Sequence, residues 1–365
     1  MGLPVKLNLY EEALLDALPD GEAAEALRAS GLPHRRVEAW KWSDLRTVLS
    51  RLPAKAGVMA ARMPREADSD VLAVSEPVSL PARLAGLLGG PAGMLVLKGG
   101  ERFTLDVSAS EGASHRALAI EVPAGISAVL HERYALEAGA FANIALDIRL
   151  GEGARLTRII EQDAAPDAVL VVTGTVTLAR NADYAQTTLG FGAKLARIET
   201  HLTHPGQGAR VRLDSAYLLA EGLHLDQTSI VRHTGPHGVT EELSKGAVMP
   251  GGRGVFQGKI HVERAAQKTD ARMNHRGLLL GERAEIDAKP ELEIYADDVA
   301  CAHGNALGEL DAEALFYMRQ RGISEIAARA LLTESFLAEP LERIEDEALR
   351  DALLARLRTA LEALR

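Results

Sequence analysis

The residues whose types and spacing could bind a metal lie in the segment 290–308. It holds the only cysteine of the chain, Cys301, and a histidine two residues later, His303. Side chains of an extended strand return to the same face every second residue, so His303, Cys301 and Asp297 are expected to share one face. A thiolate and an imidazole are ligands for a soft or borderline metal ion, but a tetrahedral site takes four ligands. Because the chain has no second cysteine, such a site would need ligands from another chain.

Two other interpretations of this segment stay open. Unpaired cysteine is often buried and packs like a small hydrophobe, so Cys301 could be inert. Asp297 and Asp298 could instead serve a β-helix polysaccharide hydrolase, in which paired carboxylates flank the scissile bond. Neighbouring strand residues point to opposite faces, however, so this pair is poorly aimed unless a bulge intervenes.

The rest of the sequence offers no other catalytic, nucleotide-binding or metal-binding motif with the expected spacing. The sequence contains no Walker-type phosphate loop, no dinucleotide fingerprint after a strand and no Gly-x-Ser-x-Gly elbow. His201 and His204 are three residues apart, and His233 and His237 are four apart. Those are helix spacings, but both pairs lie in strand-and-turn sequence, so neither is expected to bind a metal.

Composition excludes several function classes. The 365 residues have a formal net charge of −10, which argues against nucleic acid as the main partner because phosphate binding needs concentrated Lys and Arg. No apolar run of about 18 residues is present to span a membrane. The first residues also lack the basic-then-apolar order of a signal peptide, and one cysteine permits no internal disulfide. We therefore expect a cytoplasmic protein.

The patterns of apolar, turn-forming and helix-capping residues divide the chain into three regions. Residues 1–92 are expected to be mainly helical, with Asp20 as the N-cap of a helix and a connection of low order at 51–92. Trp40 and Trp42 are interpreted as aromatic anchors of this unit. Residues 93–308 consist of short β-branched or alternating runs, and residues 309–365 are expected to be helical, with Pro340 ending one helix.

The strand-rich region carries a weak internal period. Gly153-Ala-Arg-Leu, Asn181-Ala-Asp-Tyr and Gly208-Ala-Arg-Val each combine a turn residue, an alanine, a polar residue and an apolar one. Their separations are 28 (181 − 153) and 27 (208 − 181) residues. Strands that recur with their turns at a near-constant period indicate a solenoid, so we predict a parallel β-helix. A β-sandwich is the alternative, because turn spacing alone does not separate the two.

Several longer motifs occur in a characteristic order. They are Gly254-Val-Phe-Gln-Gly-Lys-Ile-His-Val, Ala266-Gln-Lys-Thr-Asp-Ala, Leu278-Leu-Leu, Lys289-Pro-Glu-Leu-Glu-Ile-Tyr-Ala-Asp-Asp-Val-Ala-Cys-Ala-His-Gly and Leu315-Phe-Tyr-Met-Arg-Gln-Arg-Gly-Ile. Together they resemble the SufB/SufD family of iron–sulphur cluster assembly proteins. Gly31-Leu-Pro and Glu38-Ala-Trp-Lys-Trp resemble the N-terminal signature of its SufD branch. The chain departs from common SufD sequences at Ala302 and at Asn305-Ala-Leu, and both candidate ligands remain in place.

The resemblance implies a mainly β protein, a right-handed parallel β-helix core flanked by helical N-terminal and C-terminal regions. It also implies a non-catalytic scaffold that pairs with a SufB-like paralogue and a SufC-like ABC ATPase. No cofactor would be permanently bound, and transient iron or a nascent cluster would be shared with the paralogue. His303 and Cys301 match positions at the interface between the paralogues.

Two surfaces are assigned on this basis. Exposed strand edges at the end of a β-helix invite pairing, so we expect 291–301 to form a dimer interface, in a homodimer or with the paralogue. Its candidate residues are Glu291, Glu293, Tyr295 and Cys301. The segment 315–336 matches the part of the family that docks the ATPase. Its candidate residues are Phe316, Tyr317, Arg319, Arg321 and Phe336.

Overall fold

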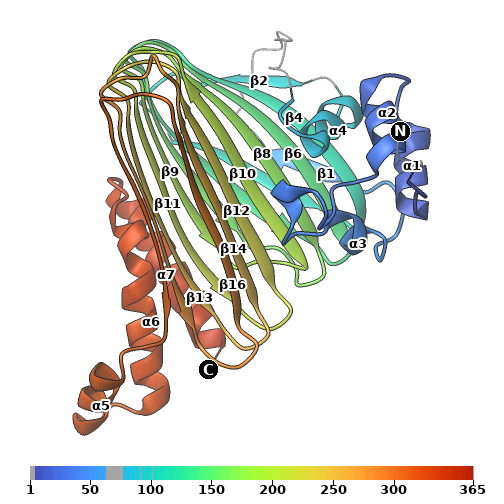
Figure 1. Cartoon of the computed structure of the whole chain (residues 1–365). Helices are drawn as coiled ribbons and strands as arrows, with labels where there is room; N and C mark the ends of the chain where they lie inside the picture. The colour runs from blue at the N-terminus through green and yellow to red at the C-terminus, as the bar shows by residue number, and fades with distance from the viewer. Residues whose placement is uncertain (1–4, 63–76, 91, 101, 365) are drawn as a thin grey trace.

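The centre of the molecule is a solenoid of two facing β-sheets, seen in the computed structural model of residues 5–62, 77–90, 92–100 and 102–364 (Figure 1). Odd-numbered strands form a nine-stranded sheet from β1 to β17, and even-numbered strands form an eight-stranded sheet from β2 to β16. Neighbouring strands are parallel and come from successive coils, except that β1 runs antiparallel to β3. The predicted parallel β-helix is therefore confirmed, and the sandwich alternative is wrong.

The strand boundaries are as follows. The nine-stranded sheet comprises β1 (Met59–Arg62), β3 (Arg102–Ala109), β5 (Ser127–Leu136), β7 (Arg155–Gln162), β9 (Asp183–Gly190), β11 (Arg210–Leu219), β13 (Val239–Val248), β15 (Asp270–Leu279) and β17 (Ala300–Gly308). The eight-stranded sheet comprises β2 (Gly93–Val96), β4 (Gly112–Val122), β6 (Ala140–Leu150), β8 (Val169–Leu178), β10 (Leu195–His204), β12 (His224–His233), β14 (Arg253–Val262) and β16 (Glu285–Ile294).

Register between coils follows the period seen in the sequence. Ser127 lies opposite Arg155, and Arg155 lies opposite Asp183, so each coil adds 28 residues (155 − 127 and 183 − 155). Later coils lengthen, and Val239 lies opposite Asp270, 31 residues on (270 − 239). Because the shift is absorbed in the turns, inward side chains still stack on inward side chains along the solenoid.

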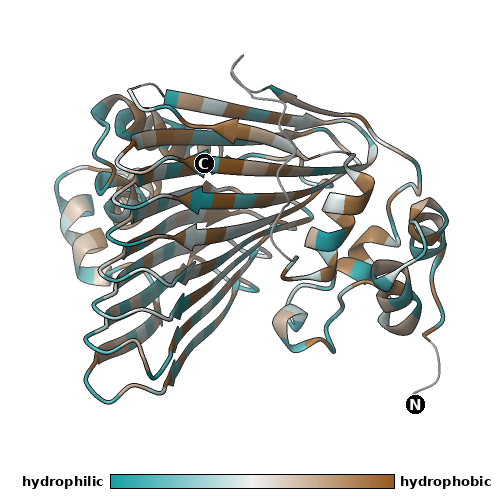
Figure 2. Cartoon of the chain, turned by 90° about the horizontal axis from the view of Figure 1, so that it is seen from above, coloured by the Kyte–Doolittle hydropathy of each residue, from teal (hydrophilic) through white to brown (hydrophobic). Residues whose placement is uncertain are grey.

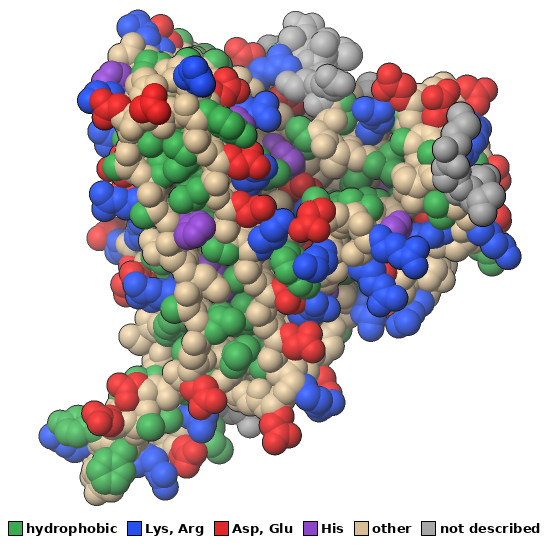
Figure 3. All heavy atoms as spheres, viewed as in Figure 1, with side chains coloured by type: hydrophobic (Ala, Val, Ile, Leu, Met, Phe, Trp, Pro, Cys, Tyr) green, Lys and Arg blue, Asp and Glu red, His purple; other side chains and the backbone are tan. Residues whose placement is uncertain are grey.

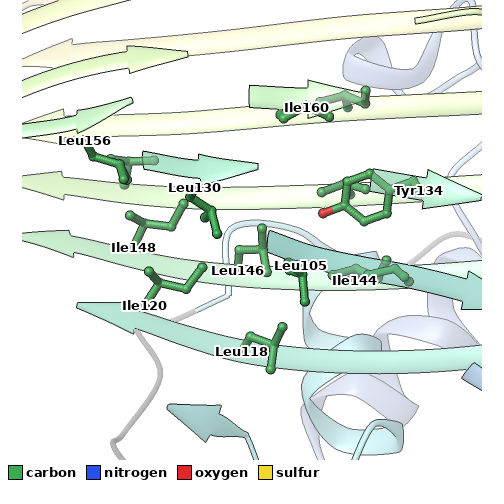
Figure 4. Close-up of a cluster of buried hydrophobic side chains, with 14 of the residues drawn as sticks. Leu105, Leu118, Ile120, Leu130, Tyr134, Ile144, Leu146, Ile148, Leu156 and Ile160 are labelled. Carbon is green, nitrogen blue, oxygen red and sulfur yellow. The ribbon is translucent and has the colours of Figure 1, made fainter. Parts of the chain in front are cut away.

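The interior of the first coils is a mainly apolar column that also encloses a buried ion pair, in which Arg158 Nε donates to Glu132 Oε1 at 2.6 Å. Every second residue of each strand points inward, and the labelled Leu, Ile and Tyr side chains of Figure 4 meet between the two sheets. Viewed from above, brown apolar positions alternate with teal polar ones along the strands (Figure 2). Burying one Leu or Ile side chain contributes about 1.5–3 kcal/mol, so this column is the main source of stability.

The N-terminal helices pack on the outer face of the eight-stranded sheet. They are α1 (Leu9–Ala17), α2 (Glu22–Ser30), the short 3-10 helix η1 (Glu38–Trp40), α3 (Leu45–Leu49) and α4 (Leu80–Leu88). Trp40 is buried among them, which confirms its expected anchoring role. Asp20 is not the cap that we predicted, because Gly21 occupies the N-cap position of α2 and makes no side-chain cap hydrogen bond.

The expectation of a low-order connection at 51–92 is wrong for the described part of that range. It contains β1, which pairs with β3, and α4, which packs on β4 and β6. The Ser79 side chain accepts a hydrogen bond from the Ala82 amide and so caps α4. A serine before Leu-Pro is a helix-start signal that the prediction missed. Residues 63–76 lie outside the described residues.

The C-terminal helices lie along the outer face of the nine-stranded sheet (Figure 1). They are α5 (Ala312–Gln320), α6 (Glu325–Glu342) and α7 (Glu347–Ala363), capped by Asp311, Ser324 and Asp346. Pro340 does not end α6, as we predicted, but lies buried in its last turn. Leu337 and Leu341 on either side of it are fully buried against the solenoid, and this packing carries the helix past the proline. No described helix is long and apolar enough to cross a membrane.

Candidate interface at the open end of the solenoid

The last coil leaves one edge of each sheet without a strand partner. β16 ends the eight-stranded sheet and β17 ends the nine-stranded sheet. A free strand edge presents unpaired backbone N–H and C=O groups that can pair with another chain. The segment 290–308 thus forms the open end of the solenoid rather than an internal strand.

Cys301 and His303 lie on the inward side of β17. Their neighbours in the preceding coil, Ala271 and Met273, are fully buried in the core. Because no described coil covers β17, Cys301 is only half-buried and His303 is exposed. The two candidate ligands therefore share one face, as expected from strand alternation.

Cys301 also contacts the apolar cluster that fills the last coils, which contains Phe256, Ile260 and Met273. Burial raises the pKa of the Cys301 thiol, so the sulfur of the isolated chain stays protonated near neutral pH. No group of three or more metal-ligating side chains occurs among the described residues. A metal held here would need further ligands and a charge that draws the thiol proton away.

Asp297 and Asp298 lie in the turn between β16 and β17, and both are exposed. The expectation that Asp297 shares a face with Cys301 is wrong, because the chain is no longer extended at that residue. Asp298 pairs with Lys268, and its backbone N–H donates to Gln267 Oε1 at 3.0 Å. These contacts fix the turn and leave no arrangement of two facing carboxylates.

The predicted dimer-interface residues fall on two different faces. Glu293 lies 2.7 Å from Lys259 Nζ and 3.0 Å from His261 Nδ1, and these hydrogen bonds lower its pKa. Glu291 lies on the same outer side of β16, and Tyr295 directly follows the strand, 58% exposed. Cys301 points inward. A partner that contacts all four must therefore wrap the rim of the coil.

Apolar side chains line the inside of this rim. Ile294 is 39% exposed and Leu307 is 43% exposed, although both occupy inward positions. Ala288 and Leu292 pack beside them on the inner cluster. Hydrophobic side chains are visible between the charged ones over the last coil (Figure 3). An apolar inner rim flanked by charged outer positions is the pattern of a protein interface.

A polar feature that sequence reasoning missed reaches this end from the interior. Tyr217 Oη lies 2.9 Å from His275 Nε2, and His275 Nδ1 lies 2.8 Å from Asn305 Oδ1. Asn305 belongs to β17, two residues beyond His303. Tyr217 and His275 are both buried, and burial lowers the pKa of His275. The sequence signal for this contact is the separation of 30 residues between His275 and Asn305 (305 − 275), about one coil, which can be used only once the register between coils is known.

A second missed contact joins two coils elsewhere. His204 Nε2 and His233 Nδ1 are 2.5 Å apart, and both rings are buried. Burial lowers the pKa of His204 to about 4 and that of His233 to about 2, so the pair is neutral. By sequence spacing, His201 is matched with His204 and His233 with His237, whereas the structure pairs His204 with His233 of the next coil.

The candidate ATPase-docking residues divide between two places. Phe316 is 64% exposed and Tyr317 is 58% exposed on α5, which has no buried residue and forms the apolar tip at the lower left of Figure 3. The Arg321 guanidinium donates to Tyr317 Oη at 2.6 Å, and Arg319 pairs with Glu325 at 3.4 Å. Phe336 instead packs on the solenoid, with Lys245 Nζ 4.5 Å from its ring centroid.

Comparison with known proteins bears on this geometry. The family described as "SUF system FeS cluster assembly, SufBD core domain" matches residues 104–336. SufD of Escherichia coli is 37% identical over 166 residues, 46% of this chain and 39% of its own. A SufBD family assembly protein of Synechocystis sp. is 35% identical over 213 residues, 58% of this chain and 47% of its own.

The chloroplastic protein ABCI7 of Arabidopsis thaliana is 35% identical over 170 residues, 46% of this chain and 36% of its own. The alignments thus span less than half the length of these three relatives. The match to a protein named SufD agrees with the SufD branch indicated by the motifs. Since the family match covers most of the solenoid, its open end and the start of α6, the chain belongs to the SufBD family of SUF-system iron–sulphur cluster assembly proteins.

Proposed function

We propose that the chain is a non-catalytic, SufD-like scaffold subunit of a SUF-type assembly complex. The observation that carries this is the open last coil, with two unpaired strand edges, an apolar rim and two inward candidate ligands. A SufB-like paralogue would pair with this end and supply the missing ligands. Iron or a nascent cluster would then be the cargo shared between the two chains.

The hydrolase alternative has no comparable support. Its two carboxylates lie side by side in an exposed turn, and Asp298 is engaged with Lys268. The family match concerns cluster assembly. Residence in the cytoplasm and the absence of nucleic-acid and membrane partners stay predictions from composition.

Co-expression with a SufB-like paralogue and a SufC-like ABC ATPase tests the proposal. We expect the three chains to copurify, and iron bound to the complex to fall in a His303→Ala variant. The isolated chain is expected to hold iron only well below one equivalent, because it contributes two candidate ligands. Tight iron binding by the isolated monomer, lost on Cys301→Ser, would contradict a shared site.

The ATPase is proposed to dock on α5 and the start of α6. Exposed aromatic and arginine side chains are typical interface anchors, and truncating one costs about 2 kcal/mol or more. We expect Phe316→Ala with Tyr317→Ala, or charge reversal at Arg319 or Arg321, to weaken ATPase copurification. The unfolding temperature should hardly change, because α5 has no buried residue and exposed polar contacts contribute little to stability.

A matched control separates docking from a general loss of exposed apolar surface. Val58 is 73% exposed and lies far along the chain from α5. Val58→Ala should leave ATPase copurification unchanged. If the α5 variants bind the ATPase like the unmodified chain, or if they unfold, the docking surface lies elsewhere.

A further inference from the structure

A pocket of about 420 Å³ lies at the other end of the solenoid. Its walls come from α1, the segment 54–59, the end of α4 and the first residues of β4, all of which lie together in Figure 1. β4 pairs with β2 only from Leu118 to Glu121, and it meets the N-terminal segment at Ala113. Between these contacts, Ser114, His115 and Arg116 line the pocket. None of the residues assigned to assembly lines it.

Four residues that line this pocket each carry a buried polar atom without a hydrogen-bond partner among the described residues. These atoms are Tyr10 Oη, Ser114 Oγ, His115 Nε2 and Arg116 Nε. Tyr10 is only 3% exposed and Ser114 only 5%. Buried polar groups in folded proteins are nearly always paired. Four unpaired atoms around one pocket therefore point to a missing partner.

All four atoms can donate a hydrogen. Asn143 Nδ2 donates to the Pro81 carbonyl at 2.8 Å and lies 3.1 Å from His115 Nδ1. An amide nitrogen only donates, so Nδ1 accepts and the ring proton is on Nε2. Burial lowers the pKa of His115 to about 4, which keeps the ring neutral. Burial also raises the pKa of Tyr10, so its hydroxyl keeps its proton.

The charges and the walls define the ligand class. Among the described residues that line the pocket there is no Asp or Glu, and the two cations are Arg116 and Lys55. Lys55 Nζ is already paired with Glu111 at 2.6 Å, which leaves the charge of Arg116 within this described lining. The other walls are apolar and comprise Ala13, Leu14, Ala17, Met59 and Leu88. A volume of this size is in the usual range for small-molecule sites.

We propose that this pocket binds a small monocarboxylate with an apolar body. The carboxylate accepts hydrogens from Arg116, Tyr10 and the neighbouring donors, and the apolar body lies against α1 and α4. A single negative charge matches Arg116, which has no ion-pair partner among the described residues, whereas a phosphate dianion would leave charge unbalanced. The pocket is separate from the open end of the solenoid. A negative result for carboxylate binding would therefore not affect the proposed role in cluster assembly, and a negative result for assembly would not affect the proposed carboxylate site.

Calorimetric titration of the full chain with sodium octanoate tests the ligand class. We expect saturable binding of one octanoate, at least tenfold tighter than octanol, because only the carboxylate meets the guanidinium. Octyl phosphate should bind more weakly than octanoate. The proposal is overturned if octanol binds as tightly as octanoate, if octyl phosphate binds more tightly, or if octanoate does not bind at millimolar concentration.

Single substitutions test the residues. Arg116→Gln should weaken octanoate binding at least tenfold, and Tyr10→Phe at least threefold. Arg155→Gln, an exposed arginine of β7 outside the pocket, is the matched control and should bind normally. Tyr10→Phe removes only an unpaired oxygen, so its circular dichroism melting curve should match the unmodified chain. Should Arg116→Gln fail to fold, Tyr10→Phe and the octanol comparison decide, and unaltered binding by Tyr10→Phe would refute the assignment.

Discussion

Glu242 lies inside the solenoid with one oxygen satisfied and one not. Ser229 Oγ donates to Glu242 Oε1 at 2.7 Å, whereas Oε2 has no partner among the described residues. A charged carboxylate is costly in such a place, and burial raises the pKa of Glu242 to about 7. Below that pH the folded chain therefore holds a proton that the unfolded chain releases near the ordinary glutamate pKa of 4.5.

The sign of the pH dependence follows from this difference. Between about pH 4.5 and pH 7 the folded state binds more protons at Glu242 than the unfolded state does. The contribution of Glu242 to the free energy of unfolding therefore falls as the pH rises through this range and is constant above about pH 7. We predict that Glu242→Gln, which keeps an acceptor for Ser229, removes this fall. The shift from 4.5 to about 7 corresponds to about 3 kcal/mol, so at pH 8 the variant should be more stable than the unmodified chain by about this amount.

Urea unfolding at pH 5 and pH 8 measures this effect. Comparing variant and unmodified chain at each pH cancels the titrating groups that do not interact with Glu242, including the neutral His204–His233 pair, whose contribution changes in the opposite direction. Asp214 does not cancel, because its charge also raises the pKa of Glu242. Glu282→Gln, at an exposed carboxylate, is the control and should show no such difference between the two pH values. If Glu242→Gln is less stable than the unmodified chain at pH 8, the pKa of Glu242 is not raised as we infer.

At this scale the sequence predicts which residues share a face but not which coils they join. Strand alternation placed Cys301 and His303 together, and the structure agrees. The same rule failed for Asp297, because this residue lies in the turn before β17, where the chain is not extended. His204 and His233 are 29 residues apart, about one coil, but a contact at that distance becomes visible only once the register between coils is known.

Elements were predictable where their residues are apolar and regular. The runs at β8, β10 and β14 are rich in Val, Ile and Leu, so the sequence alone indicates strands there. The signal is weak at β5, β13 and β15, because charged and small residues replace β-branched ones at several outward positions. Register pairing with the neighbouring coil, rather than local propensity, makes these segments extended.

Trp40 is a docking point of the N-terminal helices on the eight-stranded sheet, beside the packing of α4 on β4 and β6. Trp40 is 3% exposed, and the Arg197 guanidinium carbon lies 4.2 Å from its ring centroid. Arg197 is itself held by Asp226, which accepts a hydrogen bond from Ser43 at 2.5 Å. The indole, the guanidinium and the carboxylate thus join η1 to β10 and β12 across the outer face.

We predict that Trp40→Ala detaches this helical unit while the solenoid stays folded. Truncating a buried tryptophan costs about 3–5 kcal/mol, which is comparable to the stability of a small local unit. Hydrogen exchange should therefore accelerate in α1, α2 and α3 and stay slow in β8 and β10. Trp42→Ala is the control, because Trp42 is only half-buried and should leave exchange in α1 nearly unchanged. Equal exchange in both variants would show that Trp40 is not the anchor.

The whole molecule is asymmetric along the solenoid axis. At the N-terminal end, the edge strands β1 and β2 are short, β1 runs antiparallel to β3, and α4 packs on the outer face of β4 and β6. At the other end, the longer strands β16 and β17 have no further strand beside them among the described residues. A solenoid often ends in a capping element, but here α6 and α7 pack on the outer face of the nine-stranded sheet rather than over the last coil.

The last prediction concerns this bare end. Leu307 is 43% exposed although it occupies an inward position of β17, so a partner that covers the end should bury it. Leu307→Lys places a charge in that contact, and an unpaired buried charge is strongly unfavourable. We expect the variant to lose copurification with a SufB-like paralogue, and any self-association in light scattering, while its unfolding temperature changes little. Leu87→Lys, 46% exposed on α4, is the matched control and should pair normally. If Leu307→Lys still pairs at micromolar concentration, the edges of β16 and β17 are not the interface.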